Sequence, residues 1–351
     1  MERHIFNALK FIFMSKILVT GGTGLVGSHL LYFLTKQELC PIAIKRKNSD
    51  IKNVKKIFSY YTADYEALFQ KIIWKDCDIL DVVYLENIVK NVTHIYHAAA
   101  IISFNNADKD KMIEINSIGT ANIVDLSLKH KIKRLCFVSS IATLGSSNEK
   151  AVNESCMWDW SNQSGYAISK YLAEMEVWRG FAEGLSGIIV NPSLILGPGS
   201  WESGIGTIIQ KASLGMPFYP PGSCGVIDVR DLVQIMIQLL NSDIANERFI
   251  INSDHIEYKD LMSIVAKQLN KKAPHIKLSK TFMKMLIGLD VFINKIRGKR
   301  IELSTDAVKY TTANILLDSN KINSMIEFKY RKMEESIIEC VELFKTRNHE
   351  F

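Results

Sequence analysis

A tyrosine and a lysine, four residues apart, are the residues of this sequence that most directly indicate proton chemistry. Tyr166 and Lys170 lie in the segment SGYAISKY at the start of a helical pattern, so both side chains project from one helix face. A tyrosine is a poor proton donor near neutral pH unless its phenolate is stabilised. An ammonium group one turn away and a nearby helix N-terminus both provide that stabilisation. The pair indicates a general acid/base, although many helices carry this spacing by chance.

Two other segments carry polar residues that could join this pair. VSSIATLG ends a predicted strand with Ser139 and Ser140. A hydroxyl there can hydrogen-bond a substrate oxygen, or it can cap the turn that follows. INSIGTAN places Asn116 inside a predicted helix, where an amide side chain is unfavourable unless it has a partner.

A glycine-rich segment near the N-terminus indicates a phosphate site. In ILVTGGTGLVGSHLL, Gly21, Gly24 and Gly27 fall where a predicted strand becomes a helix. Glycines permit a tight turn and let a diphosphate approach backbone N–H groups, and the helix N-terminus adds positive potential. Turns also collect glycine for purely conformational reasons. The position between strand and helix favours a dinucleotide site.

The end of the second predicted strand, IAIKRKNS, bears on the choice of cofactor. NAD sites usually carry an acidic residue there for the ribose 2′-hydroxyl. This chain has Lys45, Arg46 and Lys47 instead, and a guanidinium such as that of Arg46 can bind a 2′-phosphate through two hydrogen bonds. We expect NADP(H) rather than NAD(H), the alternative being a solvated basic turn.

The elements that must position these residues alternate along the chain. Strand patterns are predicted over 16–20, 41–46, 72–79, 94–100, 134–140 and 187–195, and helical patterns over 25–37, 119–131 and 166–184. This alternation predicts an α/β fold, a Rossmann-type doubly wound parallel sheet with helices on both faces.

The rest of the chain is organised around this core. We predict an N-terminal extension over 1–15, the NAD(P)-binding domain over 16–200 and a smaller, mostly helical substrate-binding part over 201–351. A strand and helix over 226–240 are expected to return to the Rossmann core. Met14 is a second candidate for the start of the chain.

Composition limits the classes of partner. The 351 residues are 47% apolar with a net charge of +6, which is too modest for the basic stripe of a nucleic-acid-binding protein. The apolar run 282–296 is too short and too interrupted by charge to span a bilayer. Six scattered cysteines without a CxxC pair indicate a cytoplasmic protein, and no metal site is expected.

Eight motifs in order make the chain resemble the extended short-chain dehydrogenase/reductase family, also called NAD-dependent epimerase/dehydratases. They span about residues 16–235 and read TGGTGLVG, DILD, HAAA, NSIGTAN, VSSIATLG, YAISK, NPSLILGPG and IDVRDLV.

The resemblance implies a role for each matching residue. Tyr166 would be the general acid/base, and Lys170 would lower its pKa and hold the nicotinamide ribose. Ser140 would orient the reacting oxygen, a choice over Ser139 that rests on register against Gly145, and Asn116 would support the lysine through water. The remaining positions would contact the cofactor: Gly21, Thr23, Gly24, Leu25, Val26 and Gly27 at the diphosphate, Asp78 and Ile79 at the adenine, Ala98 and Ala99 along the groove, and Pro192 and Ser193 near the nicotinamide.

Three activities compete within this family: a ketone or aldehyde reductase acting on a small molecule, a nucleotide-sugar epimerase using bound NAD, and a cofactor-binding regulator. The presence of Ser140, Tyr166 and Lys170 argues against the regulator. Family dehydratases carry an Asp-Glu pair where this chain has Ile141 and Ala142. VNPSLILGPG and AAAIISF are more similar to dihydroflavonol reductases, cinnamoyl-CoA reductases and 3β-hydroxysteroid dehydrogenases, and Leu144 replaces the aromatic residue common in epimerases. We favour the reductase.

The resemblance also suggests a homodimer formed through the catalytic helix. Glu174, Glu176 and Arg179 are the residues of that helix expected at such an interface.

Overall fold

The structure is a computed structural model that describes residues 16–347 except 104, 146–150, 162, 200, 202–203, 280, 284 and 286–304. The predicted N-terminal extension 1–15, with Met14, lies outside the described residues, as does most of the apolar run 282–296.

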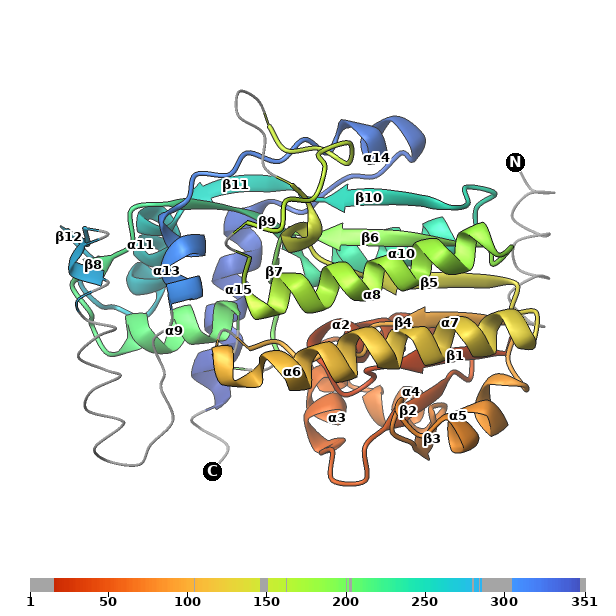
Figure 1. Ribbon diagram of the computed structural model, residues 1–351. Coiled ribbons are helices and arrows are strands. Elements are labelled where there is room, and N and C mark those ends of the chain that lie inside the picture. Colours follow the sequence, from red (N-terminus) through yellow and green to blue (C-terminus); the bar gives the residue numbers. More distant parts are fainter. Residues whose placement is uncertain are drawn as a thin grey trace.

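A seven-stranded sheet, parallel throughout, forms the centre of the molecule (Figure 1). Its order is β10-β6-β5-β4-β1-β2-β3. The chain winds outward from the middle in both directions, as in a doubly wound Rossmann sheet, so the predicted fold class is confirmed. The strands are β1 (Ile17–Thr20), β2 (Ile42–Lys45), β3 (Ile73–Asp76), β4 (His94–His97), β5 (Arg134–Val138), β6 (Gly187–Pro192) and β10 (Glu247–Ile251).

Helices cover both faces of the sheet because successive strand residues point to opposite sides. In β1, Leu18 packs towards α5, α7 and α8, whereas Val19 packs towards α2 and α10. Helices α7 and α8 run alongside each other across one face (Figure 1). The helices are α2 (Leu25–Lys36), α3 (Lys52–Ser59), α4 (Tyr65–Gln70), α5 (Val82–Val89), α7 (Gly119–Lys129), α8 (Gly165–Ala182) and α10 (Val229–Leu240).

Short helical turns connect the strands to two of these helices. After β4 come η1 (Asn106–Asp108), α6 (Lys109–Met112) and the π-helical turn η2 (Ile113–Ile118), which runs directly into α7. After β5 comes η3 (Ile141–Thr143).

The C-terminal part has its own apolar core beside the main sheet (Figure 1). A three-stranded sheet orders β11 (Asp254–Glu257), β9 (Ser223–Asp228) and β7 (Leu194–Leu196), and β12 (Ile276–Lys277) pairs with β8 (Phe218–Tyr219). The accompanying helices are α9 (Ile205–Ser213), α11 (Tyr258–Gln268), α13 (Thr305–Thr312), α14 (Asn320–Met325) and α15 (Met333–Arg347).

Three features differ from the sequence-based expectation. Within 226–240, helix α10 packs on the Rossmann core, but β9 pairs with β7 and β11 in the smaller sheet. Conversely, β10 lies in the C-terminal region expected to be mostly helical, yet it pairs with β6 and completes the main sheet. The strand expected over 187–195 is instead two strands, β6 and β7. The residue between them, Ser193, donates its N–H to the Ile251 carbonyl (3.1 Å).

Within the described ranges, no helix is long and apolar enough to cross a membrane.

The turn from β1 into α2 is packed too tightly for side chains at two of its glycines. Gly21 has a φ of +68°, and a Cβ there would lie 2.6 Å from the backbone nitrogen of Ala99. A Cβ on Gly27 would lie 2.1 Å from the Gly21 carbonyl oxygen. Gly24 differs, because its φ is −83° and its Cβ would come no nearer than 3.3 Å to that same oxygen.

We predict that Gly27→Ala destabilises the protein by about 2–3 kcal/mol, because the new methyl group forces the β1–α2 turn apart. Gly24→Ala, the matched control, should change the free energy of unfolding by less than about 1 kcal/mol. Urea unfolding of both variants measures the difference. Equal stability losses would contradict this account of the turn.

Candidate functional site

The residues predicted to form the site converge on one edge of the main sheet. Because the strands are parallel, their carboxyl ends lie together, and ligands of such sheets bind outside these ends. The described positions are Gly21 to Gly27 after β1, Arg46 after β2, Asp78 and Ile79 after β3, Ala98 and Ala99 after β4, Ser140 after β5, and Pro192 and Ser193 at the end of β6. Tyr166 and Lys170 lie on α8, and Asn116 lies in η2.

The start of α2 fits a diphosphate. Gly24 precedes the helix, is exposed, and provides no side-chain cap for the first backbone N–H groups. Glycine is not required there by packing, in contrast to Gly21 and Gly27, and its missing side chain leaves space in front of the helix N-terminus. Thr23, Leu25 and Val26 belong to the same turn. The N–H groups and the positive end of the helix dipole favour an anion at this point.

The alanines after β4 form the neighbouring wall of this edge. The Ala99 N–H donates to Thr20 Oγ1 at the end of β1 (3.2 Å), and the Ala98 N–H donates to the Thr20 carbonyl (3.3 Å). Both alanines are half-buried directly behind Gly21. The backbone of the segment that follows β4 therefore lies directly against the glycine turn.

The residues predicted at the adenine follow β3. Asp78 is exposed and accepts a hydrogen bond from the Leu80 N–H (3.0 Å). Ile79 is buried against Gly119 of α7, and its carbonyl accepts from the Asn122 amide (2.9 Å). The aspartate is therefore available to a ligand, whereas the isoleucine side chain takes part in packing.

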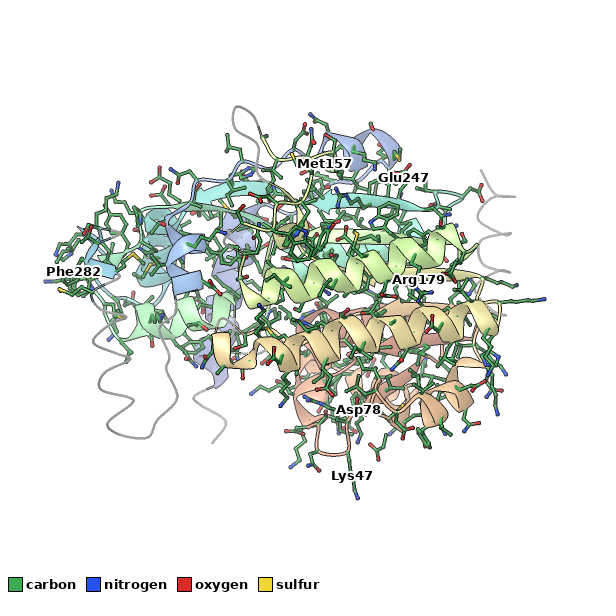
Figure 2. The ribbon with its side chains drawn as sticks, in the orientation of Figure 1. Lys47, Asp78, Met157, Arg179, Glu247 and Phe282 are labelled. Carbon is green, nitrogen blue, oxygen red and sulfur yellow. The ribbon has the colours of Figure 1, made fainter. Side chains whose placement is uncertain are left out.

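The three basic residues after β2 have different environments. Lys45 forms an ion pair with Asp76 of the adjacent strand β3. Arg46 and Lys47 are exposed, and neither side chain has a hydrogen-bond partner within the described part of the chain. Figure 2 shows Lys47 extending away from the sheet into solvent. Arg46 and Lys47 are both available to a ligand, and Arg46 lies closer to the sheet because it directly follows β2.

Tyr166 and Ser140 are joined by a hydrogen bond between their hydroxyl groups. The Ser140 hydroxyl also accepts from the Ala142 N–H (3.1 Å), so it caps η3 as well. Ser139 points elsewhere: its hydroxyl is buried and donates to Glu174. Burial raises the pKa of Tyr166 to about 12, against the opposing effect of the Ser140 hydrogen bond. The phenol is therefore protonated at neutral pH.

Lys170 is almost fully buried one helical turn beyond Tyr166. Its ammonium donates to the Val138 carbonyl at the end of β5 (2.7 Å) and lies 4.4 Å from the centre of the Phe137 ring. Burial lowers the pKa of Lys170 to about 7, while the negative charge of Glu174 acts in the opposite direction. Both protonation states of this amine are therefore accessible near neutral pH.

His97, at the end of β4, is held in the neutral form. Its ring nitrogens face Thr20 Oγ1 (2.6 Å) and Thr120 Oγ1 (2.9 Å). Burial and the nearby Lys170 charge lower the pKa of His97 to about 3. It holds β4 to β1 and α7.

Asn116 has partners that account for an amide within a helix. Its side chain accepts from the Ile101 N–H (2.7 Å) and donates to the Ile101 carbonyl and the Ser169 hydroxyl (both 2.9 Å). It thereby connects the segment after β4 to α8 next to Lys170. Its support of the lysine through water stays a prediction.

Pro192 and Ser193 end β6 close to β10. Ser193 is buried, and its hydroxyl donates to the Ile251 carbonyl (3.4 Å). This side chain serves the junction of the two sheets, and a role at the nicotinamide stays a prediction for both residues.

The expectation that Glu174 lies at a dimer interface is wrong, since its side chain is 0% exposed inside the chain's own core. Glu176 and Arg179 are partly exposed on α8, where Arg179 bonds Glu176 (2.8 Å) and Asp125 of α7 (2.6 Å). Figure 2 shows Arg179 between α8 and α7. The signal that identifies Glu174 was present in the sequence, because it continues the four-residue spacing of Tyr166 and Lys170 along one helix face.

Sequence analysis also missed the contact between α13 and the start of the catalytic helix. The Ser164 hydroxyl caps α8 by accepting from the Ala167 N–H (3.0 Å) and hydrogen-bonds Tyr310 (3.0 Å). Tyr310 also acts electrostatically on Tyr166. The C-terminal part therefore contacts the first residues of the catalytic helix, close enough for Tyr310 to act on the phenol.

A model of the NAD-dependent epimerase/dehydratase family matches residues 17–252, which include all the predicted site residues. The chain belongs to this family. No group of three or more His, Cys, Asp or Glu residues suited to a metal ion occurs within the ranges that the structure describes.

Relatives and solved structures agree with this assignment. A putative dihydroflavonol 4-reductase of Synechocystis is 24% identical over 94% of this chain and 95% of its own length. Cinnamoyl-CoA reductase 1 of Petunia hybrida is 23% identical over 72% of this chain and 76% of its own. The crystal structure of the dTDP-glucose 4,6-dehydratase DesIV from Streptomyces venezuelae, with NAD and TYD bound, has a TM-score of 0.76 at 18% identity, covering 95% of this chain and 98% of its own.

We predict that Lys170→Met stabilises the protein at pH 7 by about 2 kcal/mol. Because the pKa of Lys170 is lower in the folded than in the unfolded state, the unfolded chain binds more protons between pH 7 and pH 10.5. The burial penalty is therefore largest below pH 7 and falls as pH rises through this range.

Urea unfolding at pH 7 and pH 9.5 measures this effect. The gain from Lys170→Met should shrink at the higher pH, whereas Lys267→Met, at an exposed position on α11, should show no such trend. A Lys170→Met variant less stable than wild type at pH 7 would refute the prediction.

Proposed function

We propose that this protein is an NADP(H)-dependent oxidoreductase that reduces a ketone or aldehyde of a small organic molecule, or oxidises the corresponding alcohol. The observation that carries the proposal is the hydrogen bond between Ser140 and Tyr166, one helical turn from the buried Lys170, beside the glycine turn. A phenol, a hydroxyl and an ammonium at the ligand-binding edge of a Rossmann sheet are the groups that carbonyl reduction needs.

In this proposal the nicotinamide cofactor, when bound, supplies the hydride. Ser140 donates a hydrogen bond to the substrate oxygen, and the Tyr166 phenol transfers its proton to that oxygen as negative charge develops there. Lys170, as the ammonium, stabilises the phenolate that remains. A Tyr166 pKa of about 12 keeps the phenol protonated at pH 7, which favours the direction of reduction.

The residues at the sheet edge would divide the cofactor between them. Gly24 and the first turn of α2 would hold the diphosphate, Asp78 would lie beside the adenine, and Ala98 and Ala99 would border the groove. Arg46 would bind the 2′-phosphate, which supports NADP(H); without that contact the cofactor would be NAD(H).

Reductase chemistry is preferred to sugar-nucleotide chemistry for two reasons. Ile141 and Ala142 follow Ser140 where dehydratases of the family have an acidic pair. The two curated relatives described above are also named as reductases. Epimerisation with bound NAD is the second candidate, because the family and the fold are shared with enzymes of nucleotide sugars. A cytoplasmic location and a homodimer through the exposed face of α8 remain predictions.

We predict that Tyr166→Phe lowers kcat by about 100-fold or more, because the substrate oxygen loses its proton donor. NADPH oxidation is followed at 340 nm with a panel of aldehydes and ketones. Tyr171→Phe, five residues along the same helix and stacked on Trp158, is the matched control and should retain activity. Full turnover by Tyr166→Phe would remove Tyr166 from this role, and copurified, non-exchangeable NAD would support the epimerase.

We also predict that Arg46→Asp weakens NADPH binding by about tenfold or more and improves NADH binding. Titration with each cofactor, followed by quenching of tryptophan fluorescence, gives both dissociation constants. Lys47→Asp makes the same charge change at a side chain directed away from the sheet, and should have a smaller effect. Tighter binding of NADH than NADPH by the wild-type protein would overturn the cofactor assignment.

A further inference from the structure

A fully buried carboxylate lies one turn beyond Lys170 on the catalytic helix. Glu174 has a side chain with 0% exposure, and both of its oxygens are hydrogen-bonded. Removing a carboxylate from water is costly unless donors compensate it, so a charge in this position needs an explanation. The proposed acid/base chemistry of Tyr166 and Lys170 makes no direct use of it.

One carboxylate oxygen holds the segment that carries Ser140. Oε2 of Glu174 accepts from Ser139 Oγ (2.5 Å) and Thr143 Oγ1 (2.8 Å), which lie on either side of Ser140. It also accepts from Asn191 Nδ2 (2.9 Å), and that amide donates to the Ser140 carbonyl (3.0 Å). Because Glu174 and Tyr166 share α8, these bonds fix the position of Ser140 relative to the phenol.

The other oxygen faces a cation from the far edge of the sheet. Oε1 accepts from Arg248 Nη1 on β10 (3.0 Å) and from Trp178 Nε1 (3.4 Å). Arg248 is mostly buried and also donates to the Glu154 carbonyl (3.1 Å). This ion pair joins the edge strand β10 to the catalytic helix.

Glu174 also supplies the negative charge that acts on Lys170. The titratable groups around Lys170 are Tyr166 and Glu174, one turn before and one turn after it on α8, and His97 at the end of β4. Strand β5 adds two uncharged contacts, the Val138 carbonyl and the Phe137 ring. The tyrosine and the histidine are neutral near pH 7, whereas the glutamate favours the ammonium form of Lys170.

We propose that Glu174 is a positioning residue of this site: it fixes Ser140 against Tyr166 and, from one helical turn beyond Lys170, favours the ammonium form of that lysine. The inference rests on the proposed reductase function, since it gives a catalytic purpose to a group that touches neither substrate nor cofactor. A purely structural glutamate would support the fold but would not change the ionisation of Lys170.

The kinetic test compares Glu174→Gln with wild type over pH 6–9. We expect kcat to fall at least tenfold, while the KM for the carbonyl substrate and the dissociation constant of NADPH change less than threefold. The alkaline limb of the kcat profile should move to lower pH, because the ammonium of Lys170 is lost earlier. Glu176→Gln, which removes a partly exposed carboxylate from the same helix, should change neither kcat nor the alkaline limb of its pH profile.

Two further variants separate geometry from charge. Glu174→Asp keeps the charge on a shorter side chain, and Ser139→Ala with Thr143→Val removes two donors but keeps the carboxylate. Both should lower kcat and leave the alkaline limb in place. Wild-type kcat in the double variant, or an unshifted limb in a folded Glu174→Gln, would overturn the proposal. If Glu174→Gln does not fold, the double variant decides the positioning role.

A measurement independent of turnover completes the test. The stabilising shift of the urea midpoint caused by Lys170→Met should be larger in the Glu174→Gln background than in wild type, because the isolated ammonium is then costlier to bury. Equal shifts would overturn the charge coupling. Absence of wild-type turnover with every carbonyl compound would instead refute the proposed function, and the midpoint shifts would still report on the coupling.

Discussion

The burial of the Lys170 ammonium is the constraint on which the rest of the site depends. A cation removed from water requires acceptors, and here the Val138 carbonyl and the Phe137 ring provide them from β5, while Glu174 provides charge from α8. Helix α8 must therefore lie directly on the sheet at this point. Tyr166, one turn earlier, is consequently brought against Ser140 at the same sheet edge.

Much of this arrangement is predictable from sequence because it depends on local rules. A strand followed by a glycine turn and a helix fixes the position of Gly21 to Gly27, and parallel strands place the residues that follow them along one edge. The four-residue spacing of Tyr166 and Lys170 places both on one helix face. These features require only the periodicities of helix and strand, and the structure has them as expected.

The features that sequence reasoning missed depend on contacts between distant segments. The five-residue strand β10 resembles any short apolar run, and only its pairing with β6 shows that it belongs to the main sheet. Glu174 was expected at a dimer interface, on the outside of the chain, whereas its side chain is buried inside the chain. Its partner Arg248 lies 74 residues away along the chain, and no local pattern connects the two.

The same long-range contacts suggest how the two parts of the chain cooperate. Arg248 joins the edge strand β10 to Glu174, and Tyr310 of α13 bonds Ser164 at the first residues of the catalytic helix. Two segments from the C-terminal third of the sequence, β10 in the main sheet and α13 beside it, are thus attached to both ends of the segment that carries Tyr166 and Lys170. Under the proposed function, the C-terminal part would help to place a substrate against the phenol, whereas the turn from β1 into α2 would hold the cofactor.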